Sequence, residues 1–166
     1  MKFTHSIVVF YCRIVILASL GHIQAKIRWD DLNYEKSYGA TEAYNNSKLA
    51  NVLHSKELAR RLQGSNINVY CLHPGIVNTE VFRHVDKKWY IKLFRSLGKP
   101  LFITPAQGAQ TTLYCCLEDS IENESGEYYS NCKKSKANKR GRNEANQKRL
   151  WEISEQMVGL KNSQHP

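Results

Sequence analysis

The sequence predicts an α/β fold with a parallel sheet, and three observations support this. Residues 13–18 form a largely β-branched apolar run that does not alternate, which is typical of a strand covered on both faces. Residues 42–62 place apolar side chains at helical spacing, with two arginines in the last turn and Gly64 after it. Residues 67–72 form a second short apolar run. A strand, a helix and a strand with short links indicate the βαβ unit of an open sheet.

The later elements extend this α/β pattern. Pro105 is placed to open a helix over residues 106–117, and residues 126–130 resemble a last strand. Residues 150–160 predict a short closing helix. We therefore expect about three parallel strands with helices on both faces of the sheet.

The positive charge of the chain is concentrated in one segment. The formal net charge is +9, and residues 133–149 hold eight basic residues against one acid, Glu144. Few aromatic residues lie among these bases and no nucleic-acid recognition motif is present, so we interpret the segment as a solvated tail and expect no nucleic-acid partner. We expect little ordered structure there and no role in catalysis. The predicted organisation is a catalytic domain over residues 1–132, a basic tail over 133–149 and a closing helix and end over 150–166.

Neither the cysteines nor the N-terminal residues indicate a special class of protein. The five cysteines are irregularly spaced and form no Cys-x-x-Cys pair, so we expect reduced thiols, no disulfide framework and no metal site. The first twenty residues resemble a signal peptide only superficially, because Arg13 interrupts the apolar run and no clear cleavage site follows. The uninterrupted run is also too short to cross a bilayer. A buried strand is the preferred interpretation.

Tyr44 and Lys48 form the first candidate catalytic pair. They lie four residues apart in the predicted helix, and this spacing puts both side chains on one helix face. A cation held near a phenol favours its deprotonated form, which would make Tyr44 a general acid or base for a carbonyl or alcohol oxygen. The spacing alone is weak evidence, since Tyr129 and Lys133 repeat it in a probable strand.

The neighbouring motifs identify a family. Residues 43–51, Ala-Tyr-Asn-Asn-Ser-Lys-Leu-Ala-Asn, resemble the Tyr-x-x-x-Lys helix of short-chain dehydrogenase/reductases in the wording of their retinol dehydrogenase-like subgroup. Upstream, residues 13–22 resemble the strand of that subgroup that ends in a serine, here Ser19. Downstream, residues 72–80 match the Pro-Gly-x-Val-x-Thr loop of the family. The resemblance covers about residues 13–132 and implies the C-terminal part of a Rossmann-type, doubly wound sheet.

The resemblance also implies roles for individual residues. Ser19 would hold the substrate oxygen near Tyr44, Tyr44 would transfer the proton, and Lys48 would bind the nicotinamide ribose and favour the tyrosinate. The implied catalytic residues are Ser19, Tyr44 and Lys48. The implied cofactor-binding residues are Tyr44, Lys48, Pro74, Gly75, Val77 and Thr79, for NAD or NADP. The implied reaction interconverts an alcohol and a carbonyl on an apolar substrate such as a retinoid.

One departure from the family pattern leaves two functions open. The chain has no Gly-x-x-x-Gly-x-Gly turn, and only twelve residues precede the strand at 13–18, so we expect a sheet that lacks its first strands. The first hypothesis is the catalytic half of an NAD(P)-dependent oxidoreductase that binds its cofactor weakly when alone. The second is an inactive truncated form that acts as an interaction protein, with self-association through the free edge of that strand.

Residues 87–102 carry the remaining expectation. They combine basic and aromatic side chains, which suits a lid over an apolar substrate pocket or an interfacial helix on a membrane, and we prefer the lid. The resemblance places the protein on the cytoplasmic side, with peripheral contact to an intracellular membrane such as the endoplasmic reticulum.

Overall fold

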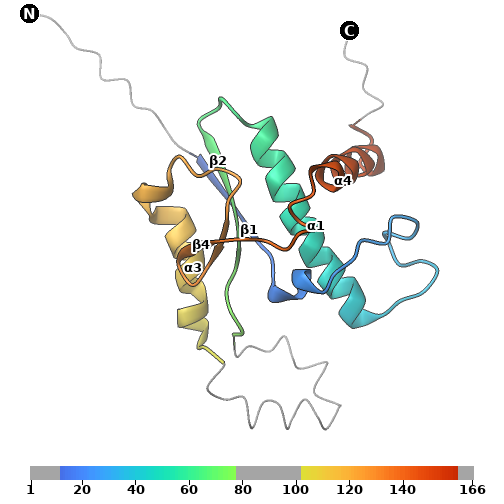
Figure 1. The fold of residues 1–166 in the computed structure, drawn as a ribbon, viewed down its shortest axis with the longest axis horizontal. Coiled ribbons are helices and arrows are strands. Elements are labelled where there is room, and N and C mark those ends of the chain that lie inside the picture. The colour runs from blue at the N-terminus through green and yellow to red at the C-terminus, as the bar shows by residue number, and fades with distance from the viewer. Residues whose placement is uncertain (1–11, 78–101, 161–166) are drawn as a thin grey trace, which may run out of the picture.

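The computed structural model describes residues 12–77 and 102–160. They form a four-stranded sheet with helices on both faces, and Figure 1 shows α3 on one side of the sheet and α1 on the other. The elements in chain order are β1 (Cys12–Leu17), η1 (Leu20–Ile23), α1 (Ala40–Arg61), β2 (Ile67–His73), α3 (Pro105–Leu117), η4 (Asp119–Ile121), β3 (Tyr128–Ser130), β4 (Lys133–Ser135) and α4 (Glu144–Met157). The predicted α/β class is confirmed.

The strand order is β1-β2-β3-β4. β1 pairs in parallel with β2, from Cys12 opposite Ile67 to Leu17 opposite Leu72, and α1 connects the two strands. β2 pairs in parallel with β3, so the prediction of about three parallel strands is confirmed. The parallel order places the carboxyl ends of these strands at one edge of the sheet, where open α/β sheets bind their ligands.

Alternating side chains of the strands divide the core into two halves. Cys71 of β2 packs with Val52 of α1, whereas its neighbours Tyr70 and Leu72 pack with Cys115 of α3. Because successive strand residues point to opposite faces, each helix covers its own set of buried side chains. Both faces of the sheet are therefore apolar, as its non-alternating strands predicted.

The expectation of a largely unstructured basic tail was wrong. β4 pairs antiparallel with β3 after a two-residue turn at Asn131 and Cys132, which both have positive φ angles (52° and 54°). Two positive φ angles match the tight hairpin turn that fits the twist of the strands. α4 begins at Glu144, six residues earlier than predicted, and its N-cap Asn143 accepts a hydrogen bond from the backbone of Asn146.

Uncharged residues between the basic ones explain why residues 133–149 are folded. All eight basic side chains of residues 133–149 are exposed, whereas Ala137, Gly141 and Gln147 are buried. A Cβ atom on Gly141 would lie 2.8 Å from Cγ1 of Val52, so this backbone packs directly on α1. The charge is solvated, as expected, but the backbone that carries it is part of the fold.

Three other features were considered in the sequence: membrane-spanning helices, metal sites and the state of the cysteines. No helix within residues 12–77 and 102–160 has the length and hydropathy to cross a membrane. Across the same residues, no group of three or more His, Cys, Asp and Glu side chains is arranged to bind a metal ion. All five cysteines are free thiols. Burial raises the pKa of Cys71 to about 11, so this thiol is a packing residue at neutral pH.

Candidate active site

The candidate site lies at the carboxyl edge of the sheet, beyond the end of β1. The strand ends at Leu17, and Ser19 then caps the short helix η1. The Ser19 hydroxyl accepts a hydrogen bond from the backbone N–H of Gly21 at 3.2 Å. Among the residues that the structure describes, none accepts a hydrogen bond from the Ser19 hydroxyl. The hydroxyl is therefore able to donate to a bound oxygen.

Tyr44 and Lys48 lie together near the start of α1. The Lys48 ammonium nitrogen is 5.4 Å from the centroid of the Tyr44 ring, and the Tyr44 side chain is 44% exposed. α1 holds this spacing because positions four apart follow one another along a helix face. An exposed phenol with an ammonium beside it is an arrangement that can exchange a proton with a small molecule.

Close packing joins the Ser19 segment to α1. Gly21 lies against the side chain of Asn45, which occupies the space that a Cβ atom would need. Asn51, two turns further along α1, donates a hydrogen bond from Nδ2 to the Leu17 carbonyl at 2.9 Å. These two contacts fix the end of β1 along the N-terminal half of α1, which carries Tyr44. That the two hydroxyls of Ser19 and Tyr44 meet at one substrate oxygen stays a prediction.

The loop after β2 forms the next part of this edge. Gly75 has a φ angle of 91°, a conformation that residues with a side chain rarely adopt. Its N–H donates a hydrogen bond to Nδ1 of His73 at 3.1 Å. Val77 then forms a parallel bridge with Ile103, and a Cβ on Gly108 of α3 would lie 2.5 Å from Cγ2 of Val77. Backbone geometry and packing thus fix residues 74–77.

Three of the implied cofactor-binding residues lie in this loop. Pro74, Gly75 and Val77 are placed by it at the carboxyl edge, whereas Thr79 lies outside the described residues. Their contact with a nicotinamide stays a prediction.

Polar side chains also gather near the carboxyl ends of β2 and β3. The His73 ring Nε2 and the Ser130 hydroxyl lie 2.8 Å apart, and the rings of His73 and His22 both face Tyr128, with centroids 6.2 Å and 5.2 Å away. Burial lowers the pKa of both histidines and raises that of the Tyr128 phenol. No local pattern in the sequence predicted this cluster, because its members come from three separate segments, η1, β2 and β3.

We expect Gly75→Ala to destabilise the protein more than Gly64→Ala. Both glycines have a positive φ angle, 91° and 86°, and alanine costs roughly 1 kcal/mol in that conformation. At Gly75 the new Cβ would also lie 2.8 Å from Cδ1 of Ile103, whereas at Gly64 nothing lies within 4 Å. Urea unfolding of the two variants measures the difference. Equal losses would show that Ile103 adjusts freely.

The unfolding free energy should fall as the pH drops below about 6.5. Burial lowers the pKa of His22, His54 and His73, and neighbouring His22 also lowers that of His73. Unfolded histidines titrate near about 6.5, so below that pH the unfolded chain binds more protons than the folded one. Urea unfolding between pH 8 and pH 5 tests this, and greater stability at the acidic end would contradict it. Replacing His54 by glutamine should make the decline shallower.

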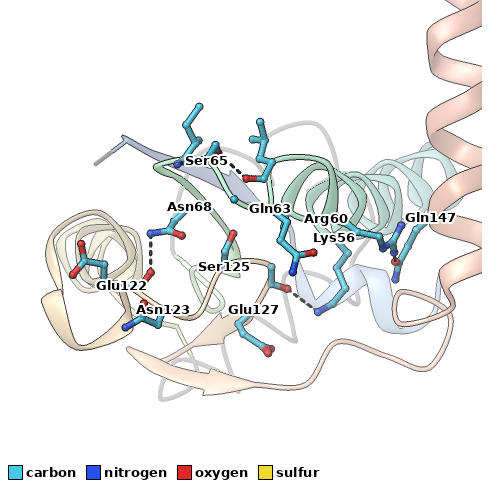
Figure 2. A pocket seen from close by; sticks show the side chains of 15 residues that line it. Lys56, Arg60, Gln63, Ser65, Asn68, Glu122, Asn123, Ser125, Glu127 and Gln147 are labelled. Carbon is cyan, nitrogen blue, oxygen red and sulfur yellow. Dashed lines mark hydrogen bonds between the residues drawn. The ribbon is translucent and has the colours of Figure 1, made fainter. Parts of the chain in front are cut away.

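One cavity among the described residues lies at the opposite edge of the sheet. It has a volume of about 620 Å³ and lies between the end of α1 and the start of β2. Figure 2 shows its polar lining, in which Lys56 donates to the Gly126 carbonyl at 2.7 Å and Asn68 donates to the Glu122 carbonyl at 2.7 Å. These side chains already donate hydrogen bonds to backbone carbonyls of the chain, and the cavity is remote from Ser19 and Tyr44. It is therefore not part of the candidate active site.

Comparison with known proteins yields close relatives. No model of a protein family matches the chain. Mouse "Retinol dehydrogenase 12" is 41% identical over 148 residues, which cover 89% of this chain and 46% of that protein. Human "Retinol dehydrogenase 14" is 43% identical over 149 residues, which cover 89% and 44%. Bovine "Dehydrogenase/reductase SDR family member 13" is 40% identical over 151 residues, covering 89% and 40%.

A solved structure also resembles the fold. The crystal structure of an uncharacterised protein from Mycobacterium paratuberculosis superposes with a TM-score of 0.66 at 26% identity, covering 90% of this chain and 51% of that protein. The chain thus spans about half the length of the relatives it matches. Over most of its own length, it is homologous to the retinol dehydrogenase-like group of the short-chain dehydrogenase/reductase family.

Proposed function

We propose that this chain carries the proton-transfer site of an NAD(P)-dependent oxidoreductase that interconverts an alcohol and a carbonyl on an apolar substrate. The placement of the Lys48 ammonium 5.4 Å from the Tyr44 ring carries this proposal. The homology to retinol dehydrogenases supports it, and a retinoid is the substrate class that their names suggest.

In this proposal Tyr44 and Ser19 act on the same substrate oxygen, and Lys48 acts on Tyr44. Tyr44 donates its hydroxyl proton to a carbonyl oxygen during reduction, and takes the proton back from an alcohol during oxidation. Lys48 stabilises the tyrosinate that remains, because an ammonium group nearby favours the anion. Ser19 donates its hydroxyl proton to the same oxygen and orients it. When bound, the dinucleotide supplies or accepts the hydride at the substrate carbon.

Lys48 and residues 74–77 suit the nicotinamide and ribose end of the dinucleotide. Lys48 carries three donors that suit the ribose hydroxyls, and residues 74–77 form a fixed backbone edge where the nicotinamide amide would lie. A pyrophosphate group is usually held by a glycine-rich turn at a helix N-terminus. The sequence contains no such Gly-x-x-x-Gly-x-Gly turn. We therefore assign only the nicotinamide and ribose contacts to this chain, and its choice between NAD and NADP stays open.

The 166-residue chain alone is expected to show no saturable micromolar binding of either reduced dinucleotide and no turnover of retinal. Its residues hold only one end of the cofactor, and loss of a well-oriented reactant forfeits much of the roughly 7–11 kcal/mol that proximity supplies. Fluorescence titration with NADH and NADPH, followed by a retinal reductase assay, measures both. Micromolar binding with turnover would mean that another segment of the chain supplies phosphate contacts.

The same assay tests the proposed chemistry when it is repeated with a complementing partner. We would co-express the chain with the part of mouse retinol dehydrogenase 12 that lies outside the match. Recovery of dinucleotide-dependent turnover would support the proposal. A soluble, dinucleotide-binding complex without turnover would contradict it.

A second candidate function is that of an inactive interaction protein. One observation favours it: within the described residues β1 pairs only with β2, so its other edge has unpaired backbone groups. Leu17 at the end of this strand is 45% exposed. Free strand edges pair readily with other chains, so self-association through β1 is the expected behaviour. Sedimentation analysis over a concentration series tests it, and a monomer throughout would contradict this candidate.

Two further predictions concern residues 87–102 and the location of the protein. The basic and aromatic residues of 87–102 suit a lid over an apolar substrate pocket or an interfacial helix on a membrane, and all of them except Phe102 lie outside the described residues. A location on the cytoplasmic side, with peripheral contact to an intracellular membrane, follows from the family resemblance. Both stay predictions.

A further inference from the structure

The segment that connects β4 to α4, residues 137–142, lies against the residues that follow Ser19. In Figure 1 it crosses from β4 over the sheet toward α4. Ala137 is buried in the same apolar cluster as Ala18, the residue just before Ser19. Two chain segments more than a hundred residues apart in sequence therefore meet at the end of β1.

This segment binds three of the carbonyl groups that come shortly after Ser19. The Asn138 side chain donates from Nδ2 to the carbonyl of His22 at 2.6 Å and to that of Ile23 at 3.3 Å. Arg140 donates from Nη1 to the carbonyl of Ala25 at 3.2 Å. Asn138 is itself held in place, because its Oδ1 accepts from the backbone N–H of Gly141 at 2.7 Å.

His22 extends this contact to Ser19 itself. The backbone N–H of Asn138 donates to Nε2 of His22 at 3.3 Å, so Nε2 is the acceptor and the ring proton lies on Nδ1. Nδ1 then donates to the Ser19 carbonyl at 2.6 Å. The ring is 2% exposed, and both of its nitrogens have partners. A neutral imidazole with one defined tautomer thus links Asn138 to the backbone of Ser19.

We propose that Asn138 and His22 are positioning residues that fix the Ser19 hydroxyl at the carboxyl edge of the sheet, and that residues 137–142 serve as the clamp that holds them. This inference rests on the proposed function, because it assigns the clamp to the residue proposed to orient the substrate oxygen. The segment that its charge marked as a solvated tail would then be needed for catalysis. Its basic side chains remain exposed, while Asn138 makes the hydrogen bonds to His22.

The test compares two asparagine-to-alanine variants of the full chain. Asn138→Ala removes the bonds of this side chain to the carbonyls of His22 and Ile23 and its bond from the Gly141 N–H. Asn68→Ala removes a side-chain bond of the same kind as that to His22, Nδ2 to the Glu122 carbonyl at 2.7 Å, at the opposite edge of the sheet. We expect Asn138→Ala to speed amide hydrogen exchange of His22, whose N–H donates to Ser19, by about tenfold relative to the core amide of Leu53. Asn68→Ala should leave that ratio within about twofold. Equal responses would overturn the clamp.

Two variants of His22 give an independent readout. Nδ2 of asparagine occupies nearly the place of Nδ1–H in histidine, so His22→Asn should keep the Ser19 amide and carbonyl resonances near their wild-type positions. His22→Phe should shift them. The ring nitrogen spectrum of the unmodified chain should show Nδ1 protonated. Protonation on Nε2, or equal shifts in the two variants, would overturn the role of His22.

Turnover in the complemented enzyme separates this inference from the proposed function. We expect Asn138→Ala to lower kcat with little change in KM, and Asn68→Ala to change neither. If the resonances of Ser19 respond but kcat does not, the clamp exists and the proposed role of Ser19 is wrong. If kcat falls without any change at Ser19, the clamp is wrong and the proposed function stands.

Discussion

Replacing Tyr44 by phenylalanine is expected to lower turnover of the complemented enzyme by about 10²–10⁴-fold, the usual contribution of a general acid or base. Phenylalanine keeps the ring beside Lys48 and removes only the hydroxyl that would exchange the proton. Because no packing is lost at a side chain that is 44% exposed, stability should be unchanged. Steady-state assays of retinal reduction and retinol oxidation measure the effect in both directions.

Tyr38→Phe is the matched control for this variant. Tyr38 lies just before α1 and is 74% exposed, and its ring lies edge-on to that of Tyr34. Its loss of a hydroxyl should leave turnover unchanged. A full rate in Tyr44→Phe, or an equal loss in Tyr38→Phe, would remove Tyr44 from the proposed chemistry.

Leu53→Ala is expected to destabilise the chain by about 2–5 kcal/mol, the range for deleting a buried leucine side chain. Leu53 of α1 is fully buried and packs with Ala25, which follows η1, and with Leu150 of α4. The cavity would loosen both contacts at once, because they share this side chain. Urea unfolding of the variant measures the loss.

Leu113→Ala is the control for that measurement. Leu113 lies on α3 and is 47% exposed, so its truncation should cost well under 1 kcal/mol. Similar losses at the two positions would show that α1 is not held in the way its packing indicates.

The central βαβ unit could be predicted from the sequence because its signals are local. The apolar runs of β1 and β2 appear in the sequence as uninterrupted segments, and the helical spacing between them matches α1. Tyr44 and Lys48 were found in the same way, since four residues along a helix determine their proximity. Physical rules that act over a few residues were sufficient for these features.

The remaining features depend on contacts between distant residues. Asn138 and His22 lie 116 residues apart, and no local pattern indicates that they meet. β4 is only three residues long and consists of Lys133, Lys134 and Ser135, so its composition suggested a tail. Antiparallel pairing with β3 and ion pairs of Lys134 with Glu124 and Glu127 stabilise it instead. Net charge indicates which side chains are solvated, and it does not show whether their backbone is folded.

The bridge between Val77 and Ile103 has a consequence for how such a protein could diversify. It brings together the two ends of the sequence interval 78–102, and on the Ile103 side Thr104 and Gln107 form a capping box that begins α3. Since the cost of closing a loop rises only slowly with its length, intervals of other lengths and compositions could be inserted between these fixed ends. Under the proposed function, exchanging this interval between relatives should thus alter substrate preference while Ser19, Tyr44 and Lys48 keep their places, which would make it a natural position for evolutionary or engineered change.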